Sequence, residues 1–155
     1  MIYQKILAAM DTSTVGDRVF DTALNLAKLN NSHLKLLHVL SPEEEDSPIS
    51  FGVVSREFNK ELIAEYKHKW EDFEKKCLET LQSRANQATA AGVNTELIQA
   101  EGVPGKQICK IAAEWDAELI VMGRRGHSVF SELVIGSVSS YVIHRAKCSV
   151  LVVQK

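Results

Sequence analysis

Short apolar runs alternate with longer helical patterns along the chain, and this alternation limits the fold more than any other feature of the sequence. Five runs have the length and composition of buried strands, at residues 5–10, 33–40, 93–100, 117–123 and 148–155. Between them, apolar residues recur every three or four positions over 15–30, about 56–91, 106–115 and about 137–145, which predicts helices. Strands that alternate with helices need crossover connections. We therefore expect an α/β fold with a five-stranded parallel sheet and helices on both faces.

The order of these strands predicts where a ligand would bind. Right-handed crossovers leave few arrangements, of which 3-2-1-4-5 is the natural one. In that order the chain reverses direction between the first and fourth strands, and ligands bind at such a point, outside the carboxyl ends of the strands. Ala9, Met10 and Asp11 follow the first strand, and the segment from Gly123 onward follows the fourth. We expect both segments at the site.

The helical segments carry more detailed expectations. An unbroken helix over 56–91 would be about 50 Å long, more than a small sheet can cover, so we expect a break or an overhang in its first half. A short coiled coil is the alternative. Gly92 fits a C-cap glycine for this helix. The hydroxyls of 12–14 are candidate N-caps for the helix over 15–30, whose apolar positions include Leu29.

Size and charge restrict the class of protein. The chain has 155 residues, which predicts one domain over 1–155. Its net charge of -2 lacks the basic footprint of a nucleic-acid binder and suggests no attraction to an anionic membrane surface. No apolar run approaches the length of a membrane span, and the first residues do not resemble a signal peptide, so we expect a cytoplasmic protein. The three cysteines form no C-x-x-C pair and are expected to be reduced, largely buried thiols.

Two polar features near the second strand have structural interpretations. His38 alternates with apolar neighbours and is expected to be packed or hydrogen-bonded inside the protein. Residues 41–55 contain two prolines and an acidic run at 43–46, and we expect a surface excursion with a solvated acidic run.

Three of the 8 glycines, Gly123, Gly126 and Gly136, fall in one stretch near the C-terminus. Glycine permits tight turns and close approach of a ligand to the backbone. Gly136 precedes a serine-rich helix start, where free main-chain N–H groups and the helix dipole favour an anion. The hydroxyls of Ser137 and Ser139 and the charges of Arg124 and Arg125 could add to such a site. Each glycine alone could do no more than shape a turn, but the combination favours a phosphate or nucleotide.

The spacing G123-x-x-G126, nine residues, then G136-S137 resembles the G-2x-G-9x-G-[S/T] signature of the universal stress protein family. The resemblance extends over the whole chain and includes KILAAMD, LKLLHVL, ELIVMGRRGHS and GSVSSYVIHRAKCSVLVV. It implies a Rossmann-like fold of the adenine nucleotide alpha hydrolase type, usually assembled as a homodimer. Members with the complete glycine signature bind ATP, so the resemblance implies ATP, together with Mg²⁺, as the ligand.

The family's pattern also implies roles for particular residues of this chain. Ala9, Met10 and Asp11 would border the adenosine, although the family's nucleotide binders often carry proline at the position of Ala9. The remaining positions, given by what they would contact, are Val39 for the adenine edge, Gly123 for the ribose, and Gly126, His127, Ser128, Gly136, Ser137, Val138 and Ser139 for the phosphates. Met122 and Arg125 complete the expected nucleotide-binding set.

The function expected is that of an ATP-binding regulatory or stress-response factor with little or no turnover, because no residue is clearly aligned as a base for water. Neither a Walker loop, a G-x-G-x-x-G fingerprint, a nucleophile elbow nor a zinc-spaced His/Cys cluster occurs. A slow ATPase or phosphotransferase that uses Asp11, His127 or the arginines stays open, as does a dimeric interaction module that binds no nucleotide. The last strand, 148–154, is expected at a sheet edge and is the expected homodimer contact.

Overall fold

The computed structural model describes residues 3–42, 44, 47–48, 60–124 and 136–154. Its five strands form one parallel sheet in the order β3-β2-β1-β4-β5, which confirms the predicted order. The strands are β1 (Lys5–Ala9), β2 (His33–Leu40), β3 (Thr95–Glu101), β4 (Leu119–Gly123) and β5 (Ser149–Val153). The helices are α1 (Thr14–Asn30), α2 (Lys60–Ala90), α3 (Pro104–Glu114) and α4 (Ser137–Arg145).

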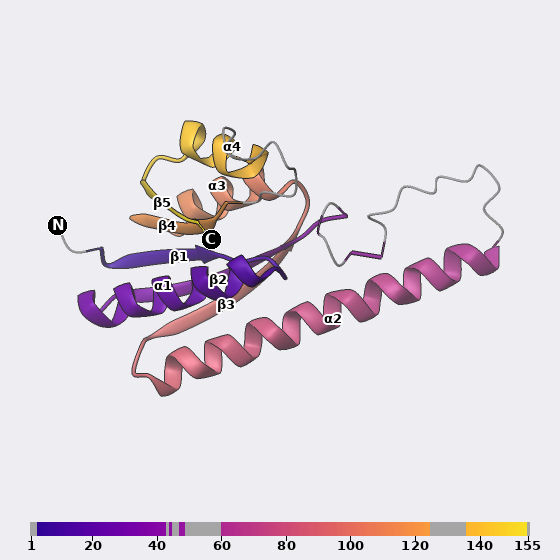
Figure 1. The fold of residues 1–155 in the computed structure, drawn as a ribbon, viewed down its shortest axis with the longest axis horizontal. Helices are drawn as coiled ribbons and strands as arrows, with labels where there is room; N and C mark the ends of the chain where they lie inside the picture. Colours follow the sequence, from indigo (N-terminus) through magenta and orange to yellow (C-terminus); the bar gives the residue numbers. More distant parts are fainter. Residues whose placement is uncertain (1–2, 43, 45–46, 49–59, 125–135, 155) are drawn as a thin grey trace.

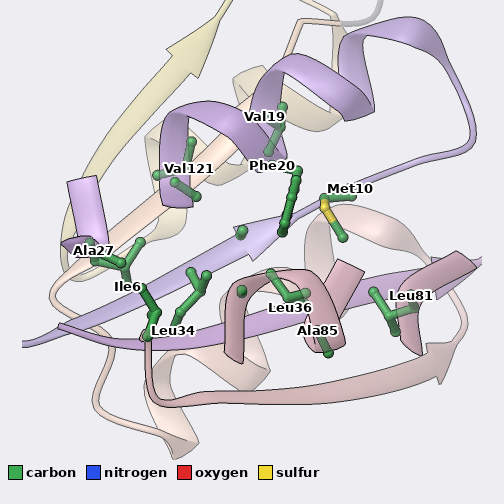
Figure 2. Close-up of a cluster of buried hydrophobic side chains, with 14 of the residues drawn as sticks. Ile6, Met10, Val19, Phe20, Ala27, Leu34, Leu36, Leu81, Ala85 and Val121 are labelled. Carbon is green, nitrogen blue, oxygen red and sulfur yellow. The ribbon is translucent and has the colours of Figure 1, made fainter. Parts of the chain in front are cut away.

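Helices cover both faces of the sheet, as Figure 1 shows: α1 and α2 lie on one side, and α3 and α4 lie on the other. The alternation of side chains along the central strands explains this, because neighbouring residues are buried on opposite faces. Ile6 and Ala8 of β1 point toward α1 and α2, where Phe20 and Leu81 also lie (Figure 2). Leu7 belongs to the cluster on the opposite face, with residues of α3 and α4.

The long helix α2 is unbroken and overhangs the sheet. Its 31 residues span about 46 Å, and its first half runs past the sheet in Figure 1. All of its buried positions lie in the second part of the helix, at Phe73, Cys77, Leu81, Ala85 and Ala88. These positions are three or four residues apart and face the sheet, so α2 packs on the core and is not a coiled-coil helix. Of the two forms that the sequence left open, the overhang is the correct one.

Helix ends agree with the sequence in general and differ in detail. Gly92 follows α2 with φ +86°, the left-handed conformation expected of a C-cap glycine. Pro104 begins α3 instead of preceding it, as the first helical position tolerates a missing N–H. Leu29 is 84% exposed, so its assignment to the buried face of α1 was wrong. It lies two residues after buried Ala27, which places it on the other side of the helix.

In the part of the chain that the structure describes, no helix is both long enough and apolar enough to span a membrane. Strand β5 lies at one edge of the sheet, as predicted, and β3 lies at the other.

Candidate functional site

A crevice opens where the chain reverses direction, at the carboxyl ends of β1 and β4. Seven of the residues predicted for the site line it together: Ala9, Met10, Asp11, Val39, Met122, Gly123 and Val138. Pro104 and Ile108 of α3, which the sequence did not single out, contribute to the same wall. The crevice has a volume of about 60 Å³. This volume holds a few water molecules and is smaller than a whole nucleotide.

Asp11 is fixed by the turn that leads into α1. Its Oδ1 accepts a hydrogen bond from the Ser13 main-chain N–H at 3.0 Å and another from the Ser13 hydroxyl. Ser13 is the N-cap residue of α1, but its hydroxyl makes no capping hydrogen bond, contrary to the expectation for the 12–14 hydroxyls. A Cβ on Gly16 would lie 2.4 Å from the Asp11 carbonyl oxygen. Glycine at this position therefore allows the first turn of α1 to pack directly on Asp11.

Gly123 closes β4 under the first turn of α1. A Cβ at this position would lie 2.5 Å from Cγ1 of Val15, which is itself buried. The packing of α1 on β4 thus requires glycine here, whether or not a ligand binds. The next residue, Arg124, donates its N–H to the Val153 carbonyl at 3.0 Å and continues the ladder with β5.

Helix α4 presents its N-terminus to the same region. Gly136 is the N-cap residue, and its carbonyl accepts the Ser140 N–H at 2.9 Å, which closes the first turn. The N–H groups of Ser137, Val138 and Ser139 belong to this first turn and have no acceptor within the helix. They form the positive end of the helix dipole, which favours an anion.

The two serines of this turn differ in what they can offer. Ser137 is exposed at the start of α4. Ser139 is 1% exposed and donates its hydroxyl hydrogen to the Gly123 carbonyl at 3.1 Å. Its hydroxyl is therefore not the donor to phosphate that the sequence suggested. It joins the first turn of α4 to the end of β4, and only the main-chain N–H of Ser139 is directed to the helix end.

Four predicted phosphate residues, Arg125, Gly126, His127 and Ser128, lie outside the described residues. Their part in the site stays a prediction from the sequence.

Beside the crevice lies a buried polar cluster, of which the sequence predicted only a part. His38 is 4% exposed, which confirms that it is packed inside the protein. Its Nε2 lies 2.9 Å and 3.0 Å from the two carboxylate oxygens of Glu44, which is 1% exposed. Thr12 Oγ1 is 3.5 Å from the same carboxylate. The expectation of a solvated acidic run is wrong for Glu44, because this carboxylate turns inward to the histidine. The other members of the run lie outside the described residues.

The tautomer of His38 follows from its second neighbour, Gln99. The side-chain nitrogen of Gln99 lies 3.2 Å from His38 Nδ1 and 3.2 Å from the Glu74 carbonyl oxygen. An amide NH₂ has two hydrogens and no acceptor, so it donates to both groups. Nδ1 is then the acceptor and Nε2 carries the proton that is donated to Glu44. The cluster thus holds the buried carboxyl group of Glu44 directly against the ring of His38.

Among residues 3–42, 44, 47–48, 60–124 and 136–154, no three His, Cys, Asp or Glu side chains are grouped as metal ligands. Asp11 is the only carboxylate among the described residues that line the crevice. A divalent cation at this site would therefore take most of its ligands from a bound nucleotide and from water, which is usual for Mg²⁺.

Comparisons with known proteins agree with this geometry. The profile of the universal stress protein family matches residues 2–154. The universal stress protein Sll1388 of Synechocystis sp. is 37% identical, with 99% of each chain covered. The structure of UspA from Lactobacillus plantarum has a TM-score of 0.77 at 22% identity and covers 99% of both chains. That of the universal stress protein from Archaeoglobus fulgidus in complex with dAMP has a TM-score of 0.59 at 26% identity and covers 98% of both. The profile match and the full-length relative together show that this chain belongs to the universal stress protein family.

Proposed function

We propose that this chain binds an adenine nucleotide, ATP with Mg²⁺, in the crevice between β1, β4 and α4, and acts as a nucleotide-dependent regulatory factor with little or no turnover. The observation that carries the proposal is the meeting of an apolar crevice and a helix N-terminus at the point where the sheet reverses. The apolar crevice suits the base and sugar of a nucleotide, and the helix N-terminus suits its phosphates. The dAMP complex of the Archaeoglobus fulgidus relative also supports an adenine nucleotide.

The lining residues divide the crevice by chemistry. Met10, Val39, Met122 and Val138 supply apolar side chains, which suit the faces of a purine ring. Asp11 supplies a carboxylate that suits a ribose hydroxyl. The first-turn N–H groups of α4 would face the phosphates, and no side chain would need to carry their charge alone.

Little turnover is expected because no general base is poised in the described part of the crevice. Its only carboxylate is Asp11, whose Oδ1 already accepts two hydrogen bonds from Ser13. A base for water needs a free acceptor within hydrogen-bond reach of the attacking oxygen. Mg²⁺ would partly neutralise the phosphates and reach the site with the nucleotide.

A charge reversal at Gly136 tests the site. Gly136 has φ −54° and ψ 154°, which Asp and Asn adopt readily, and both are good N-cap residues. Gly136→Asp and Gly136→Asn should therefore fold equally well and differ only in charge. A carboxylate near the phosphates costs at least about 1.4 kcal/mol, a tenfold loss of affinity.

Isothermal titration with Mg-ATP would show this loss for Gly136→Asp, with Gly136→Asn close to the wild type. Equal affinity in all three proteins would place the nucleotide elsewhere. Release of phosphate by the pure wild-type protein, lost in Asp11→Ala, would favour the slow ATPase instead.

The proposal includes a twofold homodimer through β5. Ser149 donates its N–H to the carbonyl of Glu118, just before β4, and the Val153 carbonyl accepts the N–H of Arg124 on the same side. The N–H and C=O groups of Val150 and Val152 consequently point to the open edge. An edge of this kind invites pairing with a second copy. Sedimentation at micromolar concentration should give a dimer for the wild type and a monomer for Val152→Pro, which loses one outward N–H. A wild-type monomer would rule this interface out.

A further inference from the structure

Two cysteines, Cys109 and Cys148, lie on the face of the sheet that α3 and α4 cover. The contact between these two helices is close. Gly105 of α3 faces Tyr141 of α4 so closely that a Cβ would lie 2.8 Å from the Tyr141 ring. The two helices therefore approach without a side chain between them at this point. One turn later on α3 is Cys109, and one turn later on α4 is Arg145. The Arg145 guanidinium lies 5.3 Å from the centre of the Tyr141 ring, so Arg145 also lies beside the contact between the two helices.

Cys109 and Cys148 pack against the same apolar cluster, although 38 residues separate them in the sequence. Both cysteines line one cavity of about 570 Å³, which Arg145 and Lys147 also border. Both are free thiols, and both are partly exposed. Cys77 is buried at 5% exposed, whereas Cys109 and Cys148 keep part of their surface accessible.

Cys148 points toward α3 and not toward the opposite face of the sheet. It precedes β5 and shares its side with Val150 and Val152, and all three pack against the same apolar cluster as Cys109. Cys77 packs in a different cluster, with Phe73 on the other face. The structure therefore separates the three cysteines into one pair and one isolated buried thiol.

From this arrangement we propose that Cys109 and Cys148 form a redox-reversible dithiol site, which a hydroperoxide oxidises to an intramolecular disulfide. The site is independent of the nucleotide crevice.

The charges around the pair assign its two roles. Burial raises the pKa of both thiols, so both are protonated at neutral pH. The positive charge of Arg145 opposes this increase in the pKa of Cys109. A negative charge on Cys109 further raises the pKa of Cys148, so the two thiols lie within electrostatic reach of each other. Arg145 lines the same cavity and would stabilise a thiolate on Cys109, so we assign the first attack to Cys109.

Oxidation takes two steps. The Cys109 thiolate attacks the terminal oxygen of ROOH, the O–O bond breaks, and sulfenic acid and ROH form. The Cys148 thiolate then attacks Sγ of Cys109, the S–S bond forms, and the S–O bond breaks to release water after protonation. In total two thiols and ROOH give one disulfide, ROH and water, and the two sulfur atoms supply the two electrons. Thiol–disulfide exchange with an external dithiol returns the reduced form.

The test uses the full-length protein, reduced, desalted and treated with hydrogen peroxide at neutral and alkaline pH. Trypsin cuts after Lys106, Lys110 and Lys147, so the disulfide would join peptides 107–110 and 148–155. We expect this joined peptide in a non-reducing digest, a loss of two hydrogens from the intact mass, and reversal by dithiothreitol. The rate should rise about tenfold per pH unit below the pKa of the attacking thiol, because it follows the thiolate fraction.

Three variants control the result. Cys77→Ala should react as the wild type does, whereas Cys109→Ala and Cys148→Ala should give no joined peptide. Circular dichroism of the reduced variants checks that each is folded. Peroxide treatment that yields only sulfinic acid on single cysteines, or only disulfides between molecules, at both pH values would overturn the proposal.

Discussion

The strongest test of the buried polar cluster is the removal of Glu44. This carboxylate is 1% exposed and receives the Nε2–H of His38, which is 4% exposed. Glu44→Ala leaves that N–H buried without its acceptor, which costs about 1–3 kcal/mol. We expect the free energy of unfolding to fall by that amount, since Glu44 contacts the buried His38 of β2 directly.

Removal of the other partner, His38, should lower the free energy of unfolding further. His38→Ala leaves a buried carboxylate without its nearest donor, with the Thr12 hydroxyl at 3.5 Å, and breaking a buried charged contact from this side costs about 3–5 kcal/mol. The double variant should lose less than the sum of the two, because neither partner is then left alone.

Urea unfolding followed by circular dichroism measures these differences, with the slope of the transition compared among variants. Glu71→Ala, an exposed glutamate on α2, is the matched control and should stay within about 0.5 kcal/mol of the wild type. Glu44→Gln keeps an oxygen acceptor for Nε2–H and should lose less than Glu44→Ala. A loss below about 0.5 kcal/mol for Glu44→Ala, or strict additivity in the double variant, would refute the hydrogen bond as an anchor.

Two further predictions concern Gly123 and the thiol pair. In Gly123→Ala the new Cβ meets Val15 Cγ1, which lies 2.5 Å from its position, so overpacking should lower the free energy of unfolding by about 1–3 kcal/mol; an unchanged urea midpoint would show that α1 shifts freely. The raised pKa of Cys109 and Cys148 means that the folded state holds these protons more tightly than the unfolded chain, whose thiols titrate near 9.0. Their contribution is complete below that pH and is lost as the pH rises through the folded pKa. Stability should therefore fall less between neutral and alkaline pH in the Cys109→Ala, Cys148→Ala double variant than in the wild type, and an equal fall would contradict the assignment.

The strand order and the position of the crevice could be predicted from the sequence because both follow from simple regularities. Buried strands of a parallel sheet are short apolar runs, and the crossover rule leaves few orders for five of them. Ala9, Asp11 and Gly123 then reach the site through topology alone, as residues at strand ends. The overhang of α2 was also predictable, since a helix of 31 residues exceeds the reach of strands with 5–8 residues.

The features that the sequence did not reveal depend on pairing between distant residues. Nothing in the acidic run distinguishes Glu44 from its neighbours until His38 is placed beside it. Cys109 and Cys148 line one cavity although they are far apart in the chain, and no local pattern records this pairing. Ser139 looked like one more hydroxyl at a helix start, and only the position of the Gly123 carbonyl shows where its hydrogen points.

That bond between Ser139 and Gly123 has a thermodynamic consequence for any anion that the first turn of α4 receives. The N-terminus of α4 is held by the end of β4 and is already oriented before a ligand arrives. Binding therefore costs little conformational entropy on this wall of the crevice. One buried hydroxyl group thus makes this wall pre-organised.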